Sequence, residues 1–165
     1  MKKNLFTIAI LAVIVISFIT FSGCEKKDIY YPSEKPNKQL YDFFKKSFDM
    51  IDEPDCFIGL KDDDTCIMIN SMEDLYRVYG CGGNLPHMDF TEHSVVVGKC
   101  TMPNLFYKIH KQYIIDNGGC LTIKLFAKLI SDDGSSYPAI NKMYYYGIYP
   151  KLPNKSLNVE LKIDK

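Results

Sequence analysis

The chain has 165 residues, of which 47% are hydrophobic and 13% aromatic, and its formal net charge is zero. This length suits one domain, and the apolar content is too high for a disordered chain. The balanced charge gives no electrostatic sign of nucleic-acid binding, and with Arg77 as the single arginine, bidentate contacts to phosphate are nearly unavailable.

The first 24 residues have the three-part pattern of an export signal. Two lysines precede an apolar run over residues 5–21, and Ser22 and Gly23 stand directly before Cys24. A membrane-spanning helix is the alternative, although about 17 apolar residues is at the short limit for crossing a bilayer. The residues before Cys24 resemble a bacterial lipobox, in which the cysteine receives a diacylglycerol thioether. We therefore expect residues 1–23 to be a lipoprotein signal peptide and Cys24 to carry the lipid.

This pattern places the protein in the cell envelope, anchored to a membrane through Cys24. The outer membrane is the expected location, with the domain either periplasmic or surface-exposed. Residues 24–36 are polar and contain Pro32 and Pro36, which is typical of a flexible, extended tether. Residues 37–165 then form a single domain.

Two helices are expected in the first half of this domain. Leu40, Phe44, Phe48 and Ile51 recur at helical spacing. A second helix follows over residues 72–79, with a capping box at Ser71 and a glycine-rich end over residues 80–83. Between the helices, short apolar runs at 55–60 and 65–70 flank an acidic turn and predict two strands.

Five further strands are expected over residues 94–101, 105–115, 120–130, 143–149 and 157–163, separated by Pro-Asn, Asn-Gly-Gly and other turn residues. The first three of these suggest an antiparallel meander. The predicted fold class is α+β, with an antiparallel sheet of about seven strands and two helices. Two arrangements remain open, because the helices can cover one sheet or the strands can divide into two packed sheets.

Five cysteines remain once Cys24 is lipidated. Cys56 and Cys66 flank the acidic turn, and two strands paired around that turn would place them opposite each other, so a disulfide between them is expected. The alternative for all five is a buried thiol that packs as a small apolar group.

No motif for catalysis or metal binding stands out. His87, Asp89 and His93 are close in sequence, but the chain has no Cys-x-x-Cys knuckle and these residues suit a solvated loop. Gly-x-Ser-x-Gly and His-Glu-x-x-His are both absent. We therefore expect no catalytic residues, no metal site, no cofactor and no enzymatic activity.

Tyrosines are concentrated near the C-terminus, at positions 144, 145, 146 and 149. Alternate residues of a strand point to opposite faces, so Tyr144 and Tyr146 share one face while Tyr145 and Tyr149 share the other. If one face is solvent-exposed, Tyr144 and Tyr146 form a candidate binding face. The alternative is a strand that is buried on both faces.

Three stretches, Ile67–Leu75, Leu85–Val97 and Ile148–Leu152, are similar to those of small Bacteroidetes lipoproteins whose domain resembles the C-terminal domain of protease complex subunit PrcB. The glycine-rich turn that often follows the central strand in that pattern is replaced here by Thr101–Asn104. The resemblance implies a noncatalytic accessory or stabilising subunit that binds an envelope protein. The alternative is a lipoprotein that binds a glycan or peptide through Tyr144 and Tyr146.

Overall fold

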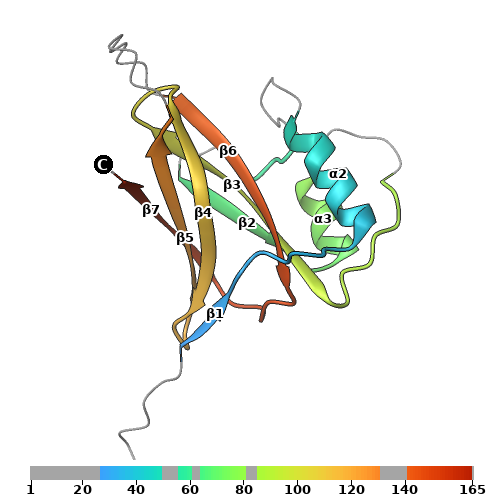
Figure 1. Ribbon diagram of the computed structural model, residues 1–165. Coiled ribbons are helices and arrows are strands. Elements are labelled where there is room, and N and C mark those ends of the chain that lie inside the picture. The colour runs from blue at the N-terminus through green and yellow to red at the C-terminus, as the bar shows by residue number, and fades with distance from the viewer. Residues whose placement is uncertain (1–26, 50–55, 61–63, 81–84, 131–140, 165) are drawn as a thin grey trace, which may run out of the picture.

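The computed structural model describes residues 27–49, 56–60, 64–80, 85–130 and 141–164. The predicted signal peptide and Cys24 lie outside these ranges. The described residues form an α+β fold with two helices and seven strands, and the strands divide into two sheets. The two sheets pack face to face, and both helices lie on the outer face of the smaller sheet (Figure 1).

The smaller sheet is antiparallel and has the strand order β2-β3-β6, with β2 at Thr65–Ile69, β3 at His93–Met102 and β6 at Asn141–Pro150. The larger sheet has the order β1-β4-β5-β7. Its strands are β1 at Asp28–Tyr30, β4 at Tyr107–Asp116, β5 at Leu121–Leu129 and β7 at Leu157–Asp164. All neighbours in it are antiparallel except β5 and β7, which are parallel.

The prediction of a single antiparallel sheet is therefore wrong. The alternative of two packed sheets, which the sequence left open, is confirmed. Half of the expected meander is confirmed, because β4 pairs antiparallel with β5. The other half is wrong, because β3 pairs with β2 and β6 and not with β4. The chain crosses from one sheet to the other through the turn at Pro103–Phe106. Turn residues mark where a strand ends but do not determine which strand it pairs with.

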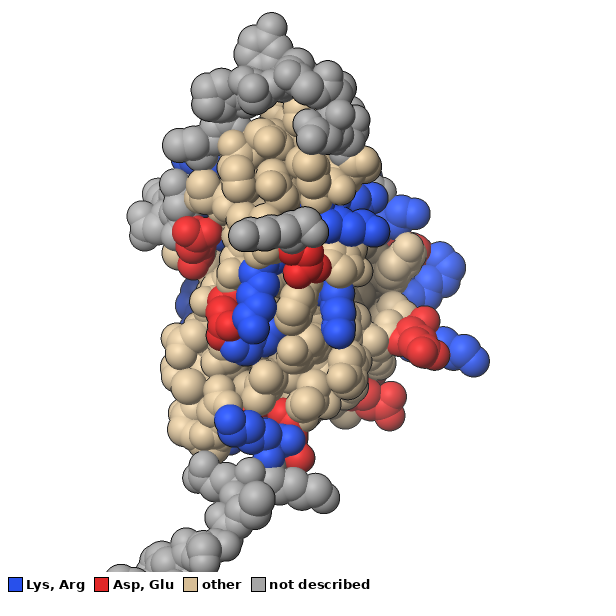
Figure 2. All heavy atoms as spheres, turned by 60° about the vertical axis from the view of Figure 1, so that its left-hand side comes forward, with Lys and Arg blue, Asp and Glu red and all other residues tan. Residues whose placement is uncertain are grey.

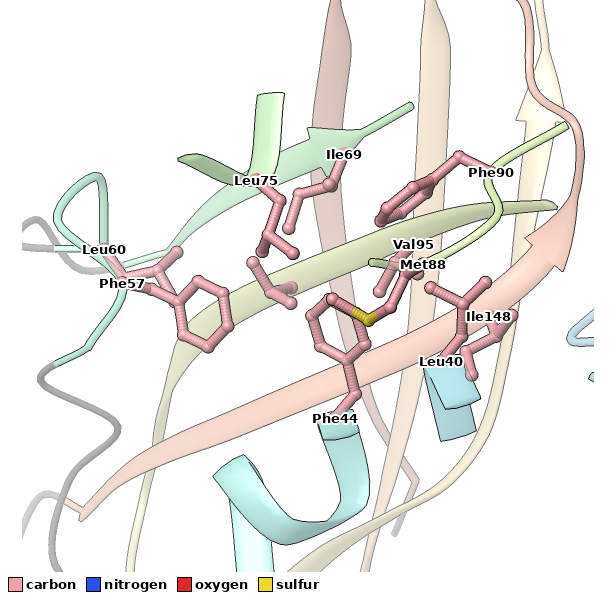
Figure 3. Close-up of a cluster of buried hydrophobic side chains, with 11 residues drawn as sticks. Leu40, Phe44, Phe57, Leu60, Ile69, Leu75, Met88, Phe90, Val95 and Ile148 are labelled. Atoms are coloured by element: carbon pink, nitrogen blue, oxygen red, sulfur yellow. The ribbon is translucent and has the colours of Figure 1, made fainter. Parts of the chain in front are cut away.

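Two apolar cores result from this layering. Side chains of β3 alternate between the two cores: Val95 and Val97 point toward the helices, and Val96 points toward the larger sheet. Figure 3 shows the core on the helix side, where Phe44 and Leu40 of α2 meet Leu75 of α3 and Ile148 of β6. The second core lies between the sheets. The smaller sheet is thus a middle layer with both faces covered.

Local signals position both helices as predicted. The helix α2 spans Lys38–Asp49, and the Asn37 Oδ1 atom accepts a hydrogen bond from the Gln39 N–H at 2.9 Å. The helix α3 spans Met72–Val78, and the Ser71 Oγ atom accepts from the Asp74 N–H at 3.0 Å. The Asp74 carboxylate in turn accepts from the Asn70 N–H at 3.0 Å, which completes the capping box one residue earlier than usual.

Two predicted segments differ in the structure. Residues 56–60 form turns, with one isolated bridge between Phe57 and Tyr79, so the strand expected at 55–60 is not formed over its described part. The tether expected over residues 24–36 is ordered from Asp28 onward, because β1 pairs with residues 114–116 of β4. The Ser33 N–H then donates to the Ile148 oxygen of β6 at 2.7 Å. Ile29 and the tyrosines that follow it have high β-strand propensity, and this preference outweighs the tendency of the nearby prolines to disfavour a strand.

Candidate functional site

A cavity of about 260 Å³ opens between β4 of the larger sheet and β6 of the smaller sheet. Residues of three elements line it. Helix α2 contributes Phe48, β4 contributes Lys108, Ile109 and Gln112, and β6 contributes the run Met143–Tyr146.

The cavity lies where two sheets present their edges on the same side of the sandwich. The strand β6 is the end strand of the smaller sheet. The strand β4 has β5 on one side, and on its other side β1 pairs only with residues 114–116. No other strand of the described residues pairs with this edge of β4 before Ile114. The first two-thirds of β4 and the adjacent part of β6 therefore form an open side.

A side chain joins these two edges. Gln112 points toward the inter-sheet core, and its Nε2 atom donates a hydrogen bond to the Tyr146 carbonyl oxygen at 2.9 Å. Its Oε1 atom is buried and has no hydrogen-bond partner among the described residues. An irregularity in the pairing of β4 with β5 lies between Ile109 and Lys111, directly before Gln112. Such bulges redirect side chains at the edge of a sheet.

Tyr144 and Tyr146 both line the cavity, as the candidate binding face requires. They are half-buried rather than displayed on an open surface, because they pack against the helix-side core. The Tyr146 ring lies 5.1 Å from the Phe48 ring and 6.4 Å from the Phe44 ring, centroid to centroid. The structure agrees with the alternative of a strand covered on both faces, and Tyr144 and Tyr146 form one wall of a recess.

Tyr145 and Tyr149 occupy the opposite face of β6, as the alternation predicts, and are buried between the sheets. Burial raises the pKa of both phenols above its usual value. The Tyr145 ring covers Gly98 of β3, where an added Cβ atom would lie 2.2 Å from the ring. Both tyrosines fill the inter-sheet core, and Tyr145 also borders the cavity that Tyr144 and Tyr146 line.

The cysteines correct another prediction. Cys66 is a free thiol, so the expected Cys56–Cys66 disulfide is wrong. Cys66 lies on β2, where it is paired with Gly98 of β3. Cys56 lies in a turn beside α3 and not on a strand next to β2. Cys56 itself is disulfide-bonded. Burial raises the pKa of Cys66 and of Cys100 to about 12, which makes both thiols poor nucleophiles.

The histidine segment is placed at the surface. His87 and Asp89 are exposed, and the Asp89 carboxylate accepts hydrogen bonds from both the N–H and the hydroxyl of Thr91, which lower its pKa. Within the described ranges, no group of three His, Cys, Asp or Glu side chains is arranged to hold a metal ion.

The three stretches that carry the PrcB-like resemblance meet in space. Residue 69 of the first pairs with Val95 of the second, which pairs with Ile148 of the third. The Lys151 ammonium donates to the carbonyl oxygens of Asn70 at 2.5 Å and Phe90 at 2.8 Å. These stretches therefore build one end of the smaller sheet, and Val97 of the second stretch pairs with Tyr146, which lines the cavity.

Sequence reasoning identified two of the cavity residues, Tyr144 and Tyr146, and missed the walls from α2 and β4. One signal was present: Gln112 is a polar residue at a core-facing position of a strand that otherwise places Ile109 and Ile114 inward. In the described part of the chain, no helix is long and apolar enough to cross a membrane. No known protein family, curated protein or solved structure matches the chain.

Proposed function

We propose that this protein is a noncatalytic, lipid-anchored accessory protein of the cell envelope, and that it binds an extended segment of a partner protein between β4 and β6. The observation that supports this function is the aromatic cavity between two open strand edges.

The size of the cavity favours a protein partner over a free small ligand. Pockets for drug-sized molecules usually have volumes of roughly 300–1,000 Å³. At about 260 Å³ the cavity is smaller, and it suits a single apolar side chain that anchors a larger partner. Phe48, Met143 and the two tyrosines provide the apolar walls for such an anchor.

The open edge provides a second mode of contact. An exposed strand edge can pair with an extended peptide through main-chain hydrogen bonds, while adjacent pockets select its side chains. The edge of β4 from Tyr107 to Tyr113 runs beside the cavity, since Lys108, Ile109 and Gln112 belong to both. A peptide strand along this edge would place one side chain against Tyr144 and Tyr146.

The anchor and the site would lie at different ends of the domain. Three residues separate Cys24 from Asp28, and these four steps of chain put the lipid-bearing residue at most about 14 Å from the start of β1. The strand β1 is paired with the Asp116 end of β4. Lys108 lies eight residues away along β4, or roughly 25 Å at the usual rise of a strand. The cavity would therefore lie at the end of the domain that is farther from the lipid anchor and from the membrane.

The PrcB-like resemblance supports the accessory role, because it implies a subunit without catalytic residues. The sequence supports the envelope location through its lipobox, and substitution of Cys24 tests that part separately. In the Cys24→Ala variant, the protein should no longer incorporate a labelled fatty acid.

The binding site is tested by photo-crosslinking in native envelopes. A photoreactive residue at position 108 lines the cavity, and one at position 128 provides a matched control, because Lys128 pairs directly with Lys108 on the next strand and does not line it. We expect a discrete protein adduct from position 108 alone. With the photoreactive residue kept at position 108, Tyr144→Ala, which removes part of the recess wall, should weaken that adduct, and Lys128→Ala should leave it unchanged. Equal adducts from both positions, or none from position 108, would overturn the proposed site.

A further inference from the structure

The outer face of the larger sheet carries a regular array of charged and aromatic side chains. The register of β4, β5 and β7 arranges nine residues in three rows across these strands. We call these rows the outer-face patch; they are Lys108–Lys128–Asp164, Lys111–Phe126–Lys162 and Tyr113–Lys124–Glu160. Figure 2 turns this side of the molecule forward and shows lysine and acidic side chains across a largely uncharged surface.

Positive charge predominates in this patch, with five lysines and two carboxylates. Glu160 pairs with Lys124 and lies 3.7 Å from Lys162, and Asp164 lies 2.8 Å from the His110 ring. Lys108 and Lys128 stand directly opposite each other on neighbouring strands. Like charges directly opposite each other destabilise a sheet, so this pair does not contribute to the stability of the fold.

A strip of three aromatic rings lies among these lysines. The Tyr113 and Phe126 rings stack with centroids 5.6 Å apart and an interplanar angle of 26°. The Tyr31 ring extends the strip at 5.8 Å from Tyr113. The Lys111 ammonium lies 5.5 Å and 5.4 Å from the two stacked rings, and the Lys162 ammonium lies 5.9 Å from the Phe126 ring.

We propose that the outer-face patch binds an acidic polysaccharide, a sugar polymer that bears carboxylate or sulfate groups. The sugar rings stack on Tyr113 and Phe126, and the lysines beside these rings hold the anionic groups. A peptide fits this face less well, because the backbone groups of β5 are engaged in the sheet on both sides. A peptide would find no main-chain partners there, whereas a polysaccharide needs only flat rings and charge.

The test measures binding of the lipid-anchored protein, extracted in a non-ionic detergent, to polygalacturonate, dextran sulfate, neutral dextran and poly-glutamate. We expect binding to one or both acidic polysaccharides, weaker binding at higher salt, and little binding to neutral dextran. Phe126→Thr should weaken the affinity about tenfold, and Phe126→Tyr, which keeps the ring, should retain it. Lys111→Gln should weaken it severalfold.

Lys45→Gln is the matched control, because the Lys45 ammonium also lies over an exposed tyrosine ring, that of Tyr41 at 5.7 Å, but on α2. This variant should bind as the wild type does. Since Lys111 is exposed, its substitution tests the site even if Phe126→Thr fails to fold. Equal affinity for poly-glutamate, an unchanged affinity in folded Phe126→Thr and Lys111→Gln, or no binding at all would each overturn the proposal.

Discussion

The Gln112 side-chain amide donates a hydrogen bond to the Tyr146 carbonyl oxygen at 2.9 Å, and this bond joins the two sheets at the open side of the sandwich. Gln112 belongs to the larger sheet and Tyr146 to the smaller one. Both residues also line the cavity. The contact therefore couples the spacing of the two strand edges to the shape of the candidate site.

Replacing Gln112 with methionine should test this contact, because methionine has a similar shape without the amide. The change removes the donor to the Tyr146 oxygen, and we expect a loss of about 1 kcal/mol in the free energy of unfolding. Urea denaturation followed by circular dichroism measures it. Gln39→Met on the exposed start of α2 should change stability by less than about 0.5 kcal/mol. A Gln112→Met variant as stable as the wild type would show that the buried, unpartnered Oε1 atom offsets the bond.

Asp116 should make the stability depend on acidic pH. The Lys155 ammonium donates to both carboxylate oxygens, at 2.8 and 2.6 Å, and with the Gly118 N–H it lowers the pKa of Asp116 below its usual 3.8. A lowered folded-state pKa contributes stability above pH 3.8 that is lost as the pH falls through the folded value.

Asp116→Asn removes this contribution. The variant should be less stable than the wild type at pH 7, and the difference should shrink below about pH 4, where the unfolded wild-type chain becomes protonated. Urea midpoints between pH 7 and pH 3 measure the effect. A difference that stays constant over this range would contradict the ionic role of the Asp116–Lys155 contact.

The described cysteines should differ in reactivity toward a maleimide. Cys66 and Cys100 have pKa values raised to about 12 by burial, and Cys120 is half-exposed. In the folded protein at pH 7.5 we expect Cys120 to be modified first, because its thiol is accessible. Denaturation without a reductant should release Cys66 and Cys100, and Cys56 should react only after reduction, since it is disulfide-bonded. Peptide mapping by mass spectrometry distinguishes these sites. Modification of Cys56 before reduction would contradict the structure.

Gly98→Ala should destabilise the protein strongly. The added Cβ atom would lie 2.2 Å from the Tyr145 ring, which is held between the two sheets. Overpacking of this kind costs about 1–3 kcal/mol, and we expect the upper part of that range because the ring is buried. Thermal unfolding measures the loss. Gly119→Ala provides the control, since no heavy atom lies within 4 Å of its added Cβ. Similar melting temperatures for the two variants would contradict the described position of Tyr145.

Local features of the sequence predicted both helices and most of the strands. The capping box at Ser71 and the apolar spacing from Leu40 act within one or two turns of chain, so they can be recognised without knowing the neighbours. The alternation of Tyr144, Tyr145 and Tyr146 was predictable for the same reason. A strand has period two wherever it packs, and the two faces of β6 divide as that period requires.

The candidate site required the tertiary structure, because it depends on which strands lie side by side. Alternation tells which residues share a face, but it does not tell that β3 and β4 belong to different sheets, or that β7 pairs in parallel with β5. These choices depend on burial of apolar surface between segments far apart in sequence. They separate Cys56 from Cys66, place β1 at the edge of β4, and bring Gln112 within 2.9 Å of the Tyr146 oxygen. The sequence by itself determined both helices, most of the strands and the faces of those strands; only the packing of two sheets decided where a cavity opens between them.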